Sequence, residues 1–106
     1  MKLMTKAIER KLPKLGATDG KGDAATVVVK FFTPDANATW FVTEGEQLPD
    51  GDWEFFGLAD MGMGCPELGY FLLSQLRQVR GRFGLPIERD RYYTGTLADA
   101  RKAVAA

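Results

Sequence analysis

Four blocks rich in β-branched and aromatic residues, at residues 26–33, 39–43, 53–58 and 68–73, dominate the middle of the chain. Such blocks are typical of strands, because these side chains pack well on a pleated surface. Turn-forming residues rich in Pro, Asp, Asn and Gly separate the first three blocks. Connections this short favour antiparallel neighbours, so the pattern predicts a four-stranded, meander-like antiparallel sheet.

Three short helices are predicted to pack on one face of this sheet. They begin after Thr5, Ser74 and Thr96, each of which carries a side-chain oxygen that can cap a helix. Asp99 follows Thr96 by three residues, a variant of the capping box. A short edge strand is expected at residues 92–93. The whole chain, residues 1–106, is therefore interpreted as a single α+β domain.

The side chains that the sequence lacks exclude several kinds of chemistry. There is no histidine, which excludes Ser-His-Asp and Cys-His catalysis, and the single cysteine, Cys65, excludes an internal disulfide. With these residues a zinc site is not expected, and neither a metal nor another cofactor is predicted. No apolar run approaches the roughly 20 residues of a membrane span, and the expected location is the cytoplasm.

Charge is segregated along a chain whose formal net charge is zero. Residues 31–76 carry eight carboxylates and no Lys or Arg, whereas residues 1–30 and 77–106 each carry seven basic and three acidic side chains. Two interpretations stay open: the acidic middle folds against the basic ends, or it forms an exposed face that binds a basic partner. The partner-binding candidates, expected in loops around a desolvated tryptophan, are Glu44, Glu46, Asp50, Asp52 and Trp53.

A second candidate surface is the arginine-rich segment of residues 77–93. Arginine interleaved with aromatic residues is typical of surfaces that bind single-stranded nucleic acid, and also of protein interfaces. Arg89 is expected to form a partly buried ion pair that holds its segment to the sheet. The nucleic-acid-binding candidates are Arg77, Arg80, Arg82, Arg91 and Tyr92.

A third hypothesis is a small enzyme that uses carboxylates. Glu88 and Asp90 would share one face of an extended segment, and Glu67 could join them to hold Mg²⁺ or to act as an acid–base pair. Ion pairs with neighbouring arginines are the simpler interpretation of these groups. The sequence therefore predicts a protein that is not an enzyme.

Several short motifs follow one another over residues 1–93. They are Met4-Thr5-Lys6, Leu12-Pro13-Lys14-Leu15, Val29-Lys30-Phe31-Phe32-Thr33-Pro34, Thr39-Trp40-Phe41-Val42-Thr43-Glu44, Glu67-Leu68-Gly69-Tyr70-Phe71, Arg80-Gly81, Gly84-Leu85 and Ile87-Glu88-Arg89-Asp90. Together they resemble the bacterial family named domain of unknown function 2958. The resemblance carries no reaction, cofactor or catalytic residue, so no site residue is transferred from it.

The resemblance implies a setting, that of an accessory protein of a plasmid, phage or conjugative element, often encoded near antirestriction genes. In that setting the preferred hypothesis is a stoichiometric antagonist of a host defence system, of the anti-restriction or anti-CRISPR type. Its partner would be a host protein, such as a defence effector whose nucleic-acid groove attracts carboxylates. Direct binding of nucleic acid is the alternative.

Overall fold

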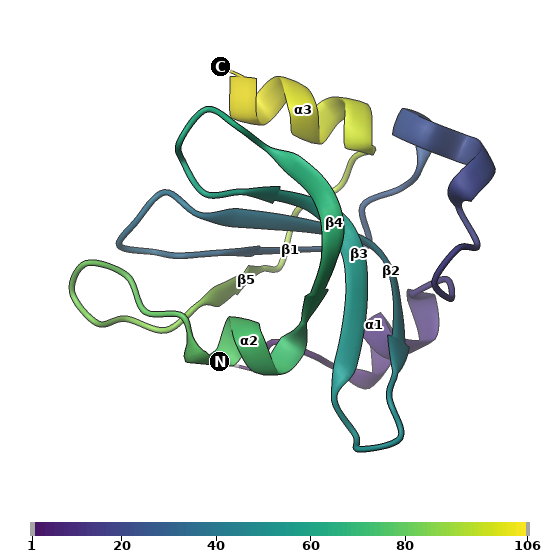
Figure 1. The fold of residues 1–106 in the computed structure, drawn as a ribbon, viewed down its shortest axis with the longest axis horizontal. Coiled ribbons are helices and arrows are strands. Elements are labelled where there is room, and N and C mark those ends of the chain that lie inside the picture. The colour runs from purple at the N-terminus through teal and green to yellow at the C-terminus, as the bar shows by residue number, and fades with distance from the viewer. Residues whose placement is uncertain (1, 106) are drawn as a thin grey trace.

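The apolar blocks form a twisted sheet, seen in Figure 1, in a computed structural model that describes residues 2–105 of the chain. In chain order the elements are α1 (Lys6–Lys11), the 3₁₀ helix η1 (Asp19–Ala24), β1 (Val29–Phe32), β2 (Thr39–Gln47), β3 (Trp53–Asp60), β4 (Glu67–Leu72), α2 (Leu73–Gln78), β5 (Glu88–Asp90) and α3 (Leu97–Ala105). The predicted α+β class with short helices is confirmed.

The strands are all antiparallel and lie in the order β4-β3-β2-β1-β5. The meander from β1 to β4 is as predicted, but the sheet has a fifth strand, β5, paired with β1. The expected edge strand at residues 92–93 is wrong, because Tyr92 lies in the turn that follows β5. The three residues of β5 are all charged and give no strand signal, so main-chain pairing with β1 places them in the sheet.

Both faces of the sheet are covered, which corrects the expectation of helices on one face only. One face buries Phe31 and Phe55 under the N-terminal segment, α1 and α2. The other buries Phe41 and Leu58 under α3 and the chain before β1. The reason is that β1 and β2 carry large apolar side chains at successive positions, and successive side chains of a strand point to opposite faces.

Two of the three predicted helix caps are confirmed. The Thr5 hydroxyl accepts a hydrogen bond from the Ile8 N–H at 3.2 Å and begins α1. At α3, the Asp99 carboxylate accepts the Thr96 N–H at 2.9 Å, and the Thr96 hydroxyl accepts the Asp99 N–H at 3.3 Å. The third is wrong, since α2 begins at Leu73 and Ser74 lies inside the helix.

A carboxylate in the β1–β2 turn holds the loop of residues 81–85 against the sheet. Asp35 Oδ2 accepts hydrogen bonds from the Phe83 N–H at 2.7 Å and from the Leu85 N–H at 3.2 Å. A Cβ on Gly81 would overlap Asp35 Oδ1, so the glycine allows this close approach. The segment before β5 is therefore anchored, although its side chains at Phe83 and Leu85 are exposed.

Replacing Asp35 with alanine is expected to release this loop. Two amide donors lose their acceptor, so the free energy of unfolding should fall by about 1–3 kcal/mol. Hydrogen exchange at the Phe83 and Leu85 amides should become faster. The control is Asp60→Ala, which removes a similar bond to the Gly62 N–H in the β3–β4 loop and should leave those two amides protected. Unchanged exchange in Asp35→Ala would show that the loop is held by other contacts.

Candidate functional site

Glu44 lies inside the molecule, so its predicted place on an exposed acidic face is wrong. Glu44 follows a shift in the register of β2 after Val42, and its side chain is 1% exposed. Its carboxylate accepts the Gly16 N–H at 2.7 Å and the Thr18 N–H at 2.8 Å, and also accepts the Thr18 hydroxyl. Burial raises the pKa of the Glu44 carboxyl, but these hydrogen bonds outweigh burial and leave the pKa below the usual 4.5.

Asp52 has a structural role at the start of α2. Its carboxylate accepts the Ser74 hydroxyl at 2.6 Å and the Ser74 N–H at 3.1 Å, so it caps the helix from a neighbouring turn. The Ser74 hydroxyl bond holds the pKa of Asp52 below its usual 3.8. Trp53 is half-buried and stacks on Phe55, with ring centroids 6.4 Å apart. Both side chains are therefore already engaged in contacts within the protein.

Glu46 and Asp50 are the two candidate carboxylates that the structure leaves exposed. Both belong to the end of the β2–β3 hairpin. Glu46 accepts a hydrogen bond from the Leu15 N–H at 3.3 Å, and Asp50 accepts the Asp52 N–H at 3.0 Å within the turn. The five candidates of the acidic face are therefore divided: Glu44 is buried, Asp52 caps α2, Trp53 is half-buried, and Glu46 and Asp50 are exposed.

The arginine-rich segment is largely exposed. Arg77, Arg82 and Arg91 have exposed side chains, and Tyr92 is 88% exposed. Arg80 is also exposed, but its guanidinium donates hydrogen bonds at 2.8 Å to the carbonyls of Arg77 and Val79 and stabilises the end of α2. The candidates other than Arg80 are thus available to a partner.

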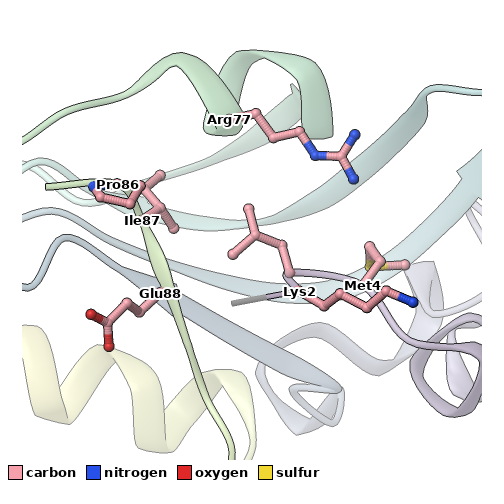
Figure 2. A pocket seen from close by; sticks show the side chains of 7 residues that line it. Lys2, Met4, Arg77, Pro86, Ile87 and Glu88 are labelled. Carbon is pink, nitrogen blue, oxygen red and sulfur yellow. The ribbon is translucent and has the colours of Figure 1, made fainter.

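Two hollows follow one another along β5. The first, of about 470 Å³, is lined by residues 2–4, by residues 86–88 and by Arg77 (Figure 2). The second, of about 410 Å³, lies mainly between residues 5–11 and residues 89–94. We call the two together the β5 groove. The Arg89 guanidinium donates a hydrogen bond at 2.8 Å to the Lys2 carbonyl and so ties the two walls together.

Strand alternation separates the charges of β5. Arg89 pairs with Phe31 and shares its face of the sheet, whereas Glu88 and Asp90 pair with Phe32 and Lys30 and point to the opposite face. Figure 2 shows the Glu88 carboxylate turned away from the Lys2 ammonium and the Arg77 guanidinium. The Asp90 carboxylate lies 3.8 Å from Lys30 Nζ, in an ion pair. Glu88 and Asp90 are part of the groove lining, but their carboxylates are directed away from the face that carries Arg89.

The basic residues of the β5 groove come from three distant parts of the sequence. They are Lys2 and Lys11 of the N-terminal wall, Arg77 of α2, and Arg89 and Arg91 of the β5 wall. A third hollow of about 380 Å³ shares Lys11, Val28, Tyr93 and Thr94 with the second and adds Lys21. Basic side chains from both chain ends therefore lie beside one edge of the sheet.

A family model described as "Protein of unknown function (DUF2958)" matches residues 3–103. The chain belongs to the DUF2958 family. This confirms the resemblance found in the short motifs, and the match extends through α3, beyond the motifs. No curated protein and no solved structure matches this DUF2958 chain. Within residues 2–105, the DUF2958 structure has no helix both long enough and apolar enough to cross a bilayer.

The three carboxylates of the enzyme hypothesis do not meet in the DUF2958 fold. Glu88 and Asp90 share a face of β5, as expected, but Glu67 begins β4 at the opposite edge of the sheet. Four strand spacings separate the two edges, roughly 19 Å. Among the residues that the structure describes, no three His, Cys, Asp or Glu side chains form a group that could hold a metal ion. The geometry therefore gives no support to carboxylate chemistry.

Sequence reasoning missed two lysines of the DUF2958 surface. Lys2 and Lys11 enter the groove only because the N-terminal segment packs beside β5, more than seventy residues later in the chain. Phe83, one of the aromatic residues interleaved with the arginines in the sequence, is 77% exposed in the anchored loop. The sequence signal that could have indicated the two lysines is the charge segregation, because both ends of the chain are basic.

Proposed function

We propose that this protein is a non-enzymatic accessory factor that binds single-stranded nucleic acid through the β5 groove. The observation that supports it most is the separation of charge by β5, which leaves Lys2, Lys11, Arg77, Arg89 and Arg91 along one groove. Basic grooves that follow a phosphate backbone, with aromatic side chains beside them, are the common features of single-strand binding. The zero net charge of the chain does not oppose this, because the five basic residues of the groove outnumber the two acidic residues of its lining, Glu88 and Asp90.

The setting is part of the proposal. The family resemblance implies a plasmid, phage or conjugative element, and we place the protein in the host cytoplasm, where such an element exposes single strands during transfer or replication. The proposal carries no cofactor and no catalytic step. Nucleic-acid binding is now preferred over binding of a host protein by the acidic face, because Glu44 is buried and Asp52 caps α2, so neither is available to a partner.

Charge reversal in the groove is expected to weaken binding of a single-stranded oligonucleotide and to lower its dependence on salt. Lys11→Glu and Arg91→Glu change exposed side chains, so both variants should stay folded. Each lost phosphate contact should reduce the slope of log K against log salt concentration by roughly 0.7 for a single strand. Fluorescence anisotropy of a labelled oligonucleotide over a salt series measures both effects.

The matched control is Lys102→Glu, an equal charge reversal at an exposed position of α3, outside the groove. It should bind as the wild type does. Equal losses in Lys102→Glu and Arg91→Glu would mean that net charge alone governs binding and would contradict a site at β5. No binding of the oligonucleotide by the wild type at low salt would reject the proposed function.

The stoichiometric defence antagonist is kept as a second candidate because Glu46 and Asp50 stay exposed at the hairpin end. Its test is the double variant Glu46→Lys and Asp50→Lys, compared with the wild type for capture of host proteins after nuclease treatment. Glu67→Lys, exposed on β4, is the control. Loss of a captured protein in the double variant alone would favour this candidate over the β5 groove.

A further inference from the structure

Two Arg-aromatic pairs, Arg82-Phe83 and Arg91-Tyr92, flank β5 in the chain. The first lies in the loop before the strand and the second in the turn after it. Their rings are highly exposed, Phe83 at 77% and Tyr92 at 88%. Each arginine beside them is exposed as well. The same two residue types thus occur in the loop before one edge strand and in the turn after it.

Both rings stand on backbone that the fold holds in place. Asp35 accepts the N–H of Phe83 itself at 2.7 Å, and Asp90 accepts the N–H of Tyr92 itself at 2.9 Å. The apolar area of an exposed ring contributes no hydrophobic stabilisation while it faces water. A flat partner that covers the ring removes this area from water, and because the backbone is already fixed, binding costs little conformational entropy.

We infer that a single strand runs along β5 with one base stacked on Phe83 and another on Tyr92, while Arg82 and Arg91 contact the adjoining phosphates. This rests on the proposed function and specifies its ligand as unpaired nucleic acid. Stacking needs the face of a base, and in a duplex the neighbouring bases cover those faces. Any base offers such a face, so the site selects single strands without selecting a sequence.

The positive charge between the two rings supports a nucleic acid over an apolar protein segment. The β5 groove is lined by the basic residues Lys2, Arg77 and Arg89. Glu88 and Asp90 also belong to its lining, but strand alternation directs their side chains to the face of the sheet opposite Arg89. A polyanion that follows β5 therefore meets three basic side chains in the groove. An apolar segment would have to remove those groups from water without compensation.

Leucine at each ring position is expected to weaken the binding of oligodeoxythymidine by roughly 5- to 150-fold, the range for loss of one stacked base. Phe83→Leu and Tyr92→Leu keep apolar bulk and remove the aromatic face. Tyr92→Phe keeps the face and should bind as the wild type does. The salt slope should stay unchanged in all three variants, because no phosphate contact is removed. Tyr70→Leu is the control, an aromatic residue 64% exposed on β4 at the other edge of the sheet.

Two further measurements separate this inference from the proposed function. Affinity should rise with oligonucleotide length and then level off once both rings are covered, in a series of about 4 to 16 nucleotides. A duplex of the same length should bind more weakly than the single strand. If the charge variants of the groove lose binding while Phe83→Leu and Tyr92→Leu do not, the stacking inference is wrong and the proposed function stands. If the wild type binds no oligonucleotide, both are wrong.

Discussion

Replacing Gly57 with alanine is expected to lower the free energy of unfolding by about 4 kcal/mol or more, a large part of the stability of a small domain. Gly57 lies in β3, between Val42 of β2 and Gly69 of β4. A Cβ at Gly57 would overlap the carbonyl oxygen of Phe41 and lie 2.8 Å from its carbonyl carbon. These are backbone atoms, so no change of rotamer relieves the overlap, and β2 and β3 would have to move apart.

The measurement is a thermal melt, in which a loss of this size lowers the midpoint by about 16 °C or more in a domain of this length. Gly69→Ala is the matched control, because Gly69 is the direct partner of Gly57 and has nothing within 4 Å of an added Cβ. Alanine at Gly69 should be neutral or slightly stabilising, since glycine weakens a strand interior. Similar melting midpoints for the two variants would contradict the close packing of β2 on β3.

The four strands β1 to β4 could be predicted because their residues carry the signal themselves. The first predicted block, Thr26–Thr33, illustrates the limit of this signal. Its β-branched and aromatic residues correctly indicate a strand, but only Val29–Phe32 of the block forms β1. β5 could not be predicted, because its Glu-Arg-Asp sequence joins the sheet through main-chain bonds to β1. Strand propensity reflects how side chains pack, and these three charged side chains have little of it. Whether so short an edge strand forms is decided by main-chain pairing with the strand beside it.

The candidate site was predicted in part. The exposure of Arg82, Arg91 and Tyr92 agrees with the expectation from composition. The groove beside Arg91 and Tyr92 could not be predicted, because its other wall is formed by the N-terminal segment. The acidic candidates were assigned to loops from their position between apolar blocks. Glu44 and Glu46 instead belong to β2, which extends to Gln47. They lie two residues apart and share a face, and Glu44 is buried because residues 16–18 pack on it, whereas Glu46 lies nearer the hairpin end and stays exposed. Sequence alone does not indicate where that loop packs.

Glutamine in place of Glu44 is expected to lower the free energy of unfolding by about 3 kcal/mol or more at neutral pH. The carboxylate satisfies three donors from Gly16 and Thr18, and a glutamine amide would direct an NH₂ group at some of them. The loop of residues 14–18 would lose its attachment to β2. Urea unfolding measures the change, and Glu46→Gln, an exposed neighbour on the same strand, should lie within about 0.5 kcal/mol of the wild type. A small effect at Glu44 would show that the loop is held without it.

Acid should remove the difference between the wild type and Glu44→Gln. The pKa of the Glu44 carboxyl is lower in the folded protein than its usual value of 4.5, so the ionised carboxylate favours folding at every pH above 4.5. This contribution is lost as the pH falls below 4.5 and through the folded-state pKa, because protonation removes the charge that the three donors stabilise. Glutamine does not titrate, so the gap in unfolding free energy between the two proteins should narrow over that range. Urea unfolding at a series of pH values tests this, and a gap that stays constant from neutral pH to well below 4.5 would mean that Glu44 is not ionised in the fold.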